Sequence, residues 1–186
     1  MSQRLLQPKI LLLVGMMGSG KTSVGRLLAK KLNLPFVDSD KEIEKSTGFT
    51  IVDLFARYGE EEFRKGEEKV MARLLAGEPC VLSSGGGAFL SQATRKLAAK
   101  SAFSIWLKVD ADVIANRTEG HTHRPLVPSA DNQEIIHRFF QKSAPFFAEA
   151  DLTVDSFEEH PSKTVIRLLQ ELEKRGIISP YHPKRL

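Results

Sequence analysis

Residues 9–22 read KILLLVGMMGSGKT, and this stretch decides the fold. Residues 9–14 form a short apolar run typical of a buried strand, and apolar residues recur at near-helical spacing over residues 21–32. Between them lies a full match to G-x-x-x-x-G-K-[ST], from Gly15 to Thr22. Such a loop turns successive backbone N–H groups and the positive end of the following helix toward phosphate oxygens. The stretch therefore predicts a loop that binds the phosphates of a nucleotide.

The same loop assigns roles to single side chains. We expect Lys21 to reach the β- and γ-phosphates of ATP and to act in catalysis, and Thr22 to offer its hydroxyl group to Mg²⁺. The residues expected to bind ATP here are Gly15, Gly18, Ser19, Gly20, Lys21, Thr22 and Ser23. A chance glycine-rich turn is the alternative, and the strand and helix on the correct sides argue against it. The loop alone does not identify the reaction, because GTPases, ATPases, motor domains and small-molecule kinases share it.

Beyond the loop, apolar β-type segments alternate with segments of helical period, which is the pattern of an α/β fold with a parallel sheet. We predict a three-layer α/β/α sandwich whose parallel sheet has about five strands, as in P-loop kinases. The expected strands are residues 9–14, 34–38, 80–83, 101–109 and 152–154. Helices are expected at residues 21–32, 39–47, 60–76, 91–99, 110–118, 132–149 and 161–174, with a further helix start near residue 50. A length of 186 residues, 41% of them hydrophobic, suits a single domain over residues 1–186.

Composition excludes several function classes. The net charge of +4 is mildly basic, but the basic residues are spread along the chain and are not interleaved with aromatic residues, so we expect no nucleic-acid partner. The single Cys80 cannot form an intramolecular disulfide, which fits the reducing cytoplasm. The apolar run at residues 10–14 is too short to span a membrane or to serve as a signal peptide. We expect a cytoplasmic protein without a membrane partner.

Two carboxylates follow the second predicted strand in the motif Asp38-Ser39-Asp40. Ligands of open α/β sheets collect at the carboxyl ends of the strands. Asp38 is therefore a candidate for the Mg²⁺ shell, and Asp40 is a candidate to bind an acceptor hydroxyl group and take its proton. Helix capping is the alternative for Asp40, and the spacing of Ser39 and Glu42 is that of a capping box.

Glycines and arginines complete the candidate site. Three consecutive glycines, Gly85, Gly86 and Gly87, end the third predicted strand and would let the backbone approach a ligand closely. Arg64 lies in a charged helical run, where a solvated face is the alternative. Residues 119–131 are polar and flanked by proline, which is typical of a mobile lid, and Arg124 in this lid could swing over the phosphates.

Taken in order, these motifs resemble the shikimate kinase family, a subgroup of the P-loop proteins with the nucleoside-monophosphate-kinase-like fold. The likeness runs from about residue 9 to about residue 154. Its motifs are the phosphate loop, Asp38-Ser39-Asp40, Ile51-Val52-Asp53-Leu54-Phe55, Phe63-Arg64 with Glu67, Gly85-Gly86-Gly87 and Arg124-Pro125-Leu126. The ordered set is more specific than any one of its members.

The resemblance implies transfer of the γ-phosphoryl group of ATP to the 3-hydroxyl group of shikimate, with Mg²⁺, in the pathway to chorismate and the aromatic amino acids. We further expect a monomer with an acceptor-binding helical segment at about residues 41–76. Asp40 would bind the ring hydroxyls of shikimate, Arg64 would bind its carboxylate, and Glu67 would orient Arg64. Further contacts implied by the resemblance come from Phe55, Phe63 and Gly85–Gly87 around the acceptor, from Arg117 along adenine and from the catalytic lid residue Arg124.

One position departs from the family pattern. The family usually has a second carboxylate-binding arginine in the helix after the lid, and this chain has Ser143 there, in Lys142-Ser143-Ala144-Pro145. Losing a charge-assisted bidentate contact costs about 1.5–3 kcal/mol of binding, which Lys142 or Arg138 could offset. We still expect Ser143 at the acceptor site. Two alternatives stay open: a kinase for another small hydroxy acid such as gluconate, and a nucleotide-binding module without turnover.

Overall fold

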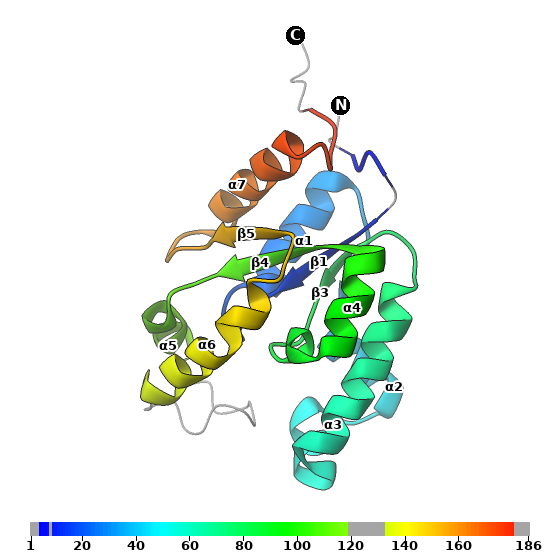
Figure 1. Ribbon diagram of the computed structural model, residues 1–186, viewed down its shortest axis with the longest axis vertical. Coiled ribbons are helices and arrows are strands. Elements are labelled where there is room, and N and C mark those ends of the chain that lie inside the picture. Colours follow the sequence, from blue (N-terminus) through cyan, green and yellow to red (C-terminus); the bar gives the residue numbers. More distant parts are fainter. Residues whose placement is uncertain (1–3, 8, 119–132, 181–186) are drawn as a thin grey trace.

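The computed structural model describes residues 4–7, 9–118 and 133–180 (Figure 1). The strands in these ranges are β1 (Ile10–Val14), β2 (Phe36–Asp38), β3 (Val81–Ser83), β4 (Ala102–Lys108) and β5 (Leu152–Asp155). The helices are α1 (Lys21–Leu32), α2 (Ser39–Thr47), α3 (Ile51–Leu75), α4 (Gln92–Ser101), α5 (Ala111–Thr118), α6 (Gln133–Phe147) and α7 (Pro161–Lys174), with a 3₁₀ turn η1 (Ala88–Leu90). The predicted lid, residues 119–131, lies wholly between α5 and α6 in the sequence and outside the described residues.

The described strands form one parallel sheet in the order β2-β3-β1-β4-β5. Helices α3, α4, α5 and α6 cover one face of this sheet, and α1 and α7 cover the other, as Figure 1 shows. The three-layer α/β/α prediction is therefore confirmed. The order has one consequence for the site: β3 lies between β1, which leads into the phosphate loop, and β2, which leads into Asp38.

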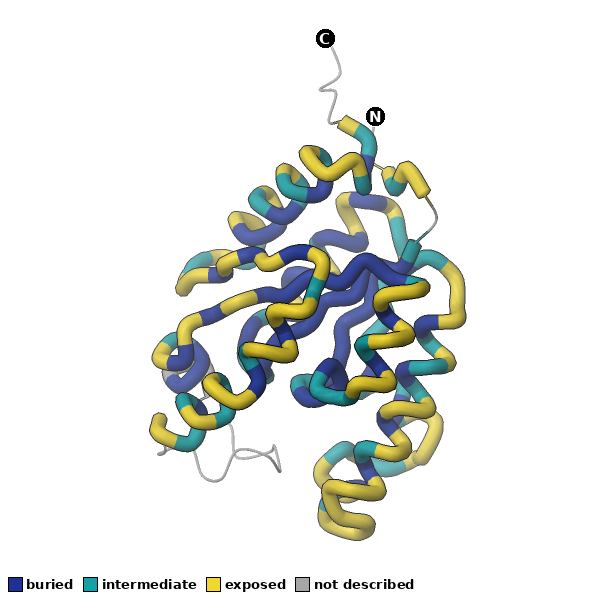
Figure 2. The backbone as a smooth tube through the Cα atoms, in the orientation of Figure 1, coloured by how far each residue is buried: buried dark blue, intermediate teal, exposed yellow. Residues whose placement is uncertain are grey.

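The core lies on both faces of the central strand β1. Leu12 and Val14 of β1 pack in a cluster with Met71 of α3, whereas Leu11 and Leu13 pack in a second cluster with α1 and α7. All five residues of β1 are buried, as the dark blue centre of Figure 2 shows. This burial explains why the strand reads as a continuous apolar run instead of an alternating one. The phosphate loop therefore begins from one of the most rigidly packed elements of the molecule.

Helix α3 contains a break in its backbone at Gly59. The sequence predicts two separate helix starts in this region, near residue 50 and at residue 60. Thr50 caps the N-terminus of α3, its Oγ1 accepting the N–H of Asp53 at 3.1 Å, which confirms a helix start there. Gly59 then adopts non-helical angles (φ 77°, ψ 173°), which an L side chain rarely adopts. The second half begins at residue 60, as predicted. A small separate core of Ile43, Leu54 and Phe63 joins α2 to both halves of α3.

The cap of α2 differs from the capping-box prediction by one residue. Asp38, not Ser39, is the N-cap: its Oδ1 accepts the N–H of Asp40 at 3.1 Å and that of Lys41 at 3.4 Å. Oδ1 thus satisfies two of the free N–H groups at the start of the helix, and Oδ2 stays available to accept from the Thr22 hydroxyl. Ser39 therefore becomes the first residue of α2, and its hydroxyl is free to bind elsewhere.

The segment after Gly176 pairs with residues near the start of the chain. Leu5 and Ile178 form an antiparallel bridge, and the N–H of Arg4 donates to the Ser179 hydroxyl at 3.1 Å. Ile178 is fully buried and belongs to the core on the side of α1 and α7.

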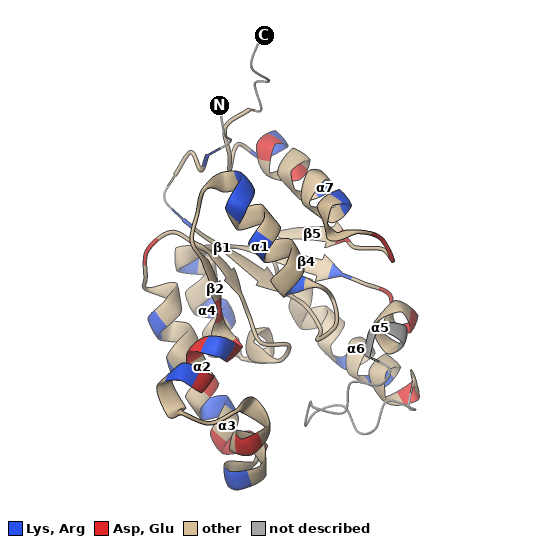
Figure 3. Cartoon of the chain, turned by 180° about the vertical axis from the view of Figure 1, so that it is seen from behind, with Lys and Arg blue, Asp and Glu red and all other residues tan. Residues whose placement is uncertain are grey.

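Charged residues of both signs are interspersed on α2 and α3 (Figure 3). Within the described ranges, no helix has the length and apolar character needed to cross a membrane.

Candidate active site

The phosphate loop has the conformation that its glycines permit. Gly15, Gly18 and Gly20 have φ angles of 138°, 75° and 89°, and a Cβ at Gly15 would lie 2.8 Å from the carbonyl oxygen of Leu107. Lys21 is buried, and its Nζ donates to the carbonyl oxygens of Gly15 at 2.8 Å and Met16 at 2.7 Å. The loop thus wraps around an ammonium group at the N-terminus of α1. This is the charge and shape that a nucleotide phosphate requires.

Thr22 and Asp38 come together beside the loop. The Thr22 hydroxyl donates to Oδ2 of Asp38 at 3.1 Å, although their strands β1 and β2 are not neighbours in the sheet. Thr22 lies at the start of α1, a helix that packs against β2 and β3 as well as β1. A hydroxyl and a carboxylate oxygen are hard ligands that suit Mg²⁺, which takes its other ligands from phosphates and water. Among the described residues, no three His, Cys, Asp or Glu side chains group as a protein metal cage would require.

The motif Asp38-Ser39-Asp40 links three parts of the site through three consecutive side chains. Asp38 binds Thr22, as above. Ser39 is fully buried, and its Oγ accepts the N–H of Gly85 at 2.8 Å. Asp40, in the first turn of α2, lines the cavity described below and does not cap the helix. Sequence analysis missed the role of Ser39, because it assigned this residue to a capping box.

Each glycine after β3 is required by a different neighbour. A Cβ at Gly85 would lie 2.6 Å from Oδ1 of Asp40 and 2.7 Å from Oε1 of Glu67. A Cβ at Gly86 would lie 3.0 Å from the backbone nitrogen of Met17 in the phosphate loop. None of the three glycines has a positive φ, so space and not backbone conformation demands glycine here. The backbone of this turn thus lies against both the phosphate loop and the carboxylates.

Arg64 lies flat against the third of these glycines. A Cβ at Gly87 would be 2.5 Å from both Nη atoms of Arg64. Nη1 of Arg64 donates to Oε2 of Glu67 at 2.6 Å, and Nη2 lies 3.4 Å from Oε1 of Glu60. The Arg64 side chain is 24% exposed, so the predicted alternative of a solvated arginine does not hold. The guanidinium group is held in one orientation, with part of its fork open to a ligand.

Glu67 is the most deeply buried carboxylate of this group, with 3% of its surface exposed. Burial raises the pKa of Glu67 above its ordinary value, the positive charge and hydrogen bond of Arg64 act in the opposite direction, and the nearby charge of Asp40 raises it further. The orientation of Arg64 therefore depends on a carboxylate that the fold holds out of water.

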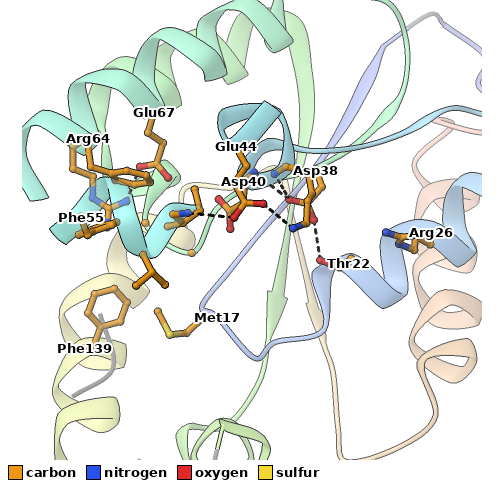
Figure 4. A pocket seen from close by; sticks show the side chains of 16 residues that line it. Met17, Thr22, Arg26, Asp38, Asp40, Glu44, Phe55, Arg64, Glu67 and Phe139 are labelled. Carbon is orange, nitrogen blue, oxygen red and sulfur yellow. Dashed lines mark hydrogen bonds and ion pairs between the residues drawn. The ribbon is translucent and has the colours of Figure 1, made fainter. Parts of the chain in front are cut away.

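These groups line a cavity of about 450 Å³, shown in Figure 4. Thr22 and Asp38 lie at one end of it, and Phe55 and Phe139 lie at the other. Phe55 and Phe63 line it as predicted, with their ring centroids 4.3 Å apart. The lining residues that sequence analysis did not assign to the site are Met17, Arg26, Lys41, Glu44, Ile51, Val52 and Phe139. Helical periodicity alone cannot separate a cavity wall from a packed face, so the sequence did not assign Phe139 to the site.

Ser143 does not line the cavity, and the side chains of Arg117 and Arg124 lie outside the described part of the structure. Ser143 is 1% exposed, and its hydroxyl donates to the carbonyl oxygens of Phe139 at 2.7 Å and Phe140 at 3.3 Å, within its own helix. It is not among the residues that line the cavity, so we do not keep it in the acceptor site. Arg117 lies in α5, and its side chain is outside the described part of the structure. Arg124 lies outside the described residues altogether.

A phosphate loop next to a small cavity with a carboxylate and an oriented arginine defines an ATP-dependent kinase of a small acceptor. Comparison with known proteins agrees with this class. The sequence profile described as shikimate kinase matches residues 17–173. The chain belongs to the shikimate kinase family.

Individual relatives support this membership over most of the chain. A shikimate kinase from Paramagnetospirillum magneticum is 48% identical over 88% of this chain and 84% of its own length. One from Bradyrhizobium diazoefficiens is 46% identical over 90% and 81%. The solved structure of a shikimate kinase from Acinetobacter baumannii in complex with shikimate has a TM-score of 0.86 at 30% identity, over 90% of this chain and 94% of that one.

Proposed function

We propose that this chain transfers the γ-phosphoryl group of Mg²⁺-ATP to the 3-hydroxyl group of shikimate, giving shikimate 3-phosphate and ADP. The observation that carries the proposal is the arrangement around Gly85–Gly87, where Asp40 and Arg64 contact the same backbone turn that touches the phosphate loop at Met17. An acid-binding group and a hydroxyl-binding group are thus joined rigidly to the phosphate donor site. The names of the relatives support the choice of shikimate over another hydroxy acid such as gluconate.

The acceptor side would work through two charged groups. The fork of Arg64, oriented by Glu67 at 2.6 Å, would bind the shikimate carboxylate. Asp40 would accept a hydrogen bond from the attacking hydroxyl group and take its proton as the new P–O bond forms. The bond between the γ-phosphorus and the bridging oxygen breaks in line, and that oxygen leaves on ADP. No covalent intermediate with the protein is needed.

The donor side would work through position and charge. Lys21 would exchange its carbonyl partners for the β- and γ-phosphate oxygens. Thr22 and Asp38 would hold Mg²⁺, which when bound neutralises charge on the phosphates. From the sequence alone, we retain Arg124 over the transferred group and Arg117 along adenine. These contacts lower the barrier by orientation and electrostatics.

We also infer a monomer that acts in the cytoplasm, where ATP is available, with ATP and shikimate as its partners. Sedimentation velocity would test the monomeric state, because a dimer at assay concentrations would contradict it.

The experiment that tests the reaction is ADP release with Mg²⁺-ATP and either shikimate, quinate, gluconate or no acceptor. Turnover should depend on shikimate and fall by about 100-fold or more in kcat for Asp40→Asn. Arg64→Ala should chiefly raise the KM for shikimate, while Lys65→Ala, in the exposed ion pairs next to it, serves as the matched control. If ATP binds but shikimate gives no more ADP than the blank, the proposal fails and the alternative of a nucleotide-binding module stands.

A further inference from the structure

Helix α6 places the ring of Phe139 in the cavity wall, whereas the family pattern predicts an arginine from this helix. Phe139 lines the cavity, whereas Ser143, one turn later on the same face, is buried and bonded to the carbonyl oxygen of Phe139. Within the described residues, α6 contributes no other side chain to the cavity wall. The contact of this helix with the acceptor is therefore apolar.

The cavity lining has a polar part and an apolar part, here called the polar wall and the apolar wall, which adjoin where Cζ of Arg64 lies 5.8 Å from the ring centroid of Phe55 and 5.4 Å from that of Phe63. Asp40, Arg64 and Glu67 form a polar wall near the glycine turn. The apolar wall is formed by Met17, Ile51, Val52, Phe55, Phe63 and Phe139. Figure 4 shows Phe139 and Met17 at the end of the cavity away from Asp38 and Thr22. Phe55 and Phe63 pack against each other within α3, and Phe139 comes from α6, so two helices contribute aromatic rings to this apolar wall.

A polar substituent that faces this wall would lose water without gaining a partner. An apolar pocket rejects an added hydroxyl group by up to about 100-fold. A ligand that fits must carry its acid group to Arg64 and its hydroxyl groups toward Asp40, and must present ring carbons without hydroxyl groups to the aromatic rings. In shikimate these carbons are C1, which carries the carboxylate, and its two neighbours, the alkene carbon C2 and the methylene carbon C6. Quinate adds a hydroxyl group at C1, and gluconate carries one on every carbon except the carboxylate.

We propose that Phe139 is a specificity-determining residue, whose ring excludes acceptors with a hydroxyl group on the edge that faces α6. This inference rests on the proposed function, since it names the substrate class of the same cavity: cyclic hydroxy acids with one bare edge. The apolar wall disfavours a ligand whose hydroxyl group would find no hydrogen-bond partner there. Arg64 and Asp40 favour a ligand whose carboxylate and hydroxyl groups they can bind. Both are needed, because a carboxylate and a hydroxyl group occur in quinate and gluconate as well.

The neighbouring residue gives a matched control. Phe140 is partly buried like Phe139 and packs against the same core, but it does not line the cavity. Equal substitutions at the two positions therefore perturb the same helix to a similar degree. Only the change at residue 139 alters the wall.

The test compares wild type with Phe139→Leu, Phe139→Asn, Phe139→Ala and Phe140→Asn. The KM for shikimate and the competitive inhibition constant of quinate are measured, and their ratio reports discrimination. Leucine and asparagine are similar in size, so we expect Phe139→Leu to keep the ratio within about three-fold and Phe139→Asn to reduce discrimination at least about ten-fold. Phe139→Ala, which admits water, should reduce it about five-fold or more, and this variant decides the matter if the asparagine variant does not fold. Phe140→Asn should leave the ratio unchanged.

The outcomes separate the two proposals. Unchanged discrimination in Phe139→Asn, or in Phe139→Ala where asparagine prevents folding, overturns the role of Phe139, and so does an equal loss in Phe140→Asn. A wild-type enzyme without shikimate-dependent ADP release overturns the proposed function itself. Wild-type turnover with an unchanged ratio therefore counts against Phe139 alone.

Discussion

Replacing Gly87 by alanine should impair acceptor binding without disturbing ATP binding. The new Cβ would lie 2.5 Å from both Nη atoms of Arg64 and 2.6 Å from its Cζ. The φ of Gly87 is −111°, which any L residue adopts, so the backbone itself resists the change little. Normal contact distances are about 3.5–4.0 Å, and the guanidinium group must therefore move by about 1 Å. Arg64 is a flexible side chain and can move, but it then leaves the place that Glu67 sets.

A displacement of about 1 Å at a positioning group reduces catalysis by up to about 100-fold. We therefore expect kcat/KM for shikimate to fall about 10- to 100-fold, or about 1.4–2.7 kcal/mol, with the KM for ATP within about two-fold of wild type. Steady-state ADP release at varied shikimate and varied ATP measures both. Gly66→Ala in α3 is the control, because a Cβ there meets nothing within 4 Å and only improves helix propensity. The geometric argument fails if kcat/KM for shikimate is unchanged in Gly87→Ala. It also fails if the KM for ATP rises by the same factor by which kcat/KM for shikimate falls.

Three further perturbations test other contacts. Ser39→Ala leaves the buried N–H of Gly85 without its 2.8 Å partner, so we expect the unfolding free energy to fall by about 1–3 kcal/mol and the KM for shikimate to rise, measured by urea unfolding and kinetics, with rescue by Ser39→Thr. Burial raises the pKa of Glu67, so ionisation of this carboxyl group opposes folding. The free energy of unfolding of the wild type should therefore fall as pH rises from about 4.5 through the raised pKa of the native state. Urea titrations at several pH values should show a flatter dependence on pH for Glu67→Gln, and an unchanged dependence would contradict the raised pKa of Glu67. Thr22→Val removes the hydroxyl group 3.1 Å from the Asp38 carboxylate and should raise the Mg²⁺ concentration needed for half-maximal turnover by about ten-fold, with thermal stability near wild type.

Local pattern was sufficient for most of the fold. The helix over residues 21–32 and the helix over residues 161–174 have the predicted bounds, because each has a strong apolar face and a defined start. Strand order was beyond the sequence, since the same apolar runs allow several neighbours. The structure shows that β2 pairs with β3 instead of β1, although Asp38 at the end of β2 contacts Thr22 at the start of α1.

The parts of the site that escaped prediction depend on long-range contacts. Ser39 has no local signal for binding Gly85, 46 positions away in the chain. Phe139 and Ser143 lie one turn apart, and only the packing of α6 decides which of them meets the cavity. The motifs located Asp40, Arg64 and the glycines correctly beside the cavity, because parallel strands bring their carboxyl ends to one edge. Their roles in binding and catalysis remain predictions.

The pairing of Leu5 with Ile178 has a consequence for the order of folding. The hydrogen bond from Arg4 to Ser179 spans 175 positions, so closing this contact costs more entropy than forming the local helices and somewhat more than pairing the inner strands. We therefore expect it to form after the rate-limiting step. Variants that weaken it should speed unfolding and leave the refolding rate nearly unchanged. The contact between the two chain ends would then set the unfolding rate, and so the lifetime of the native state. The residues of this contact do not line the cavity.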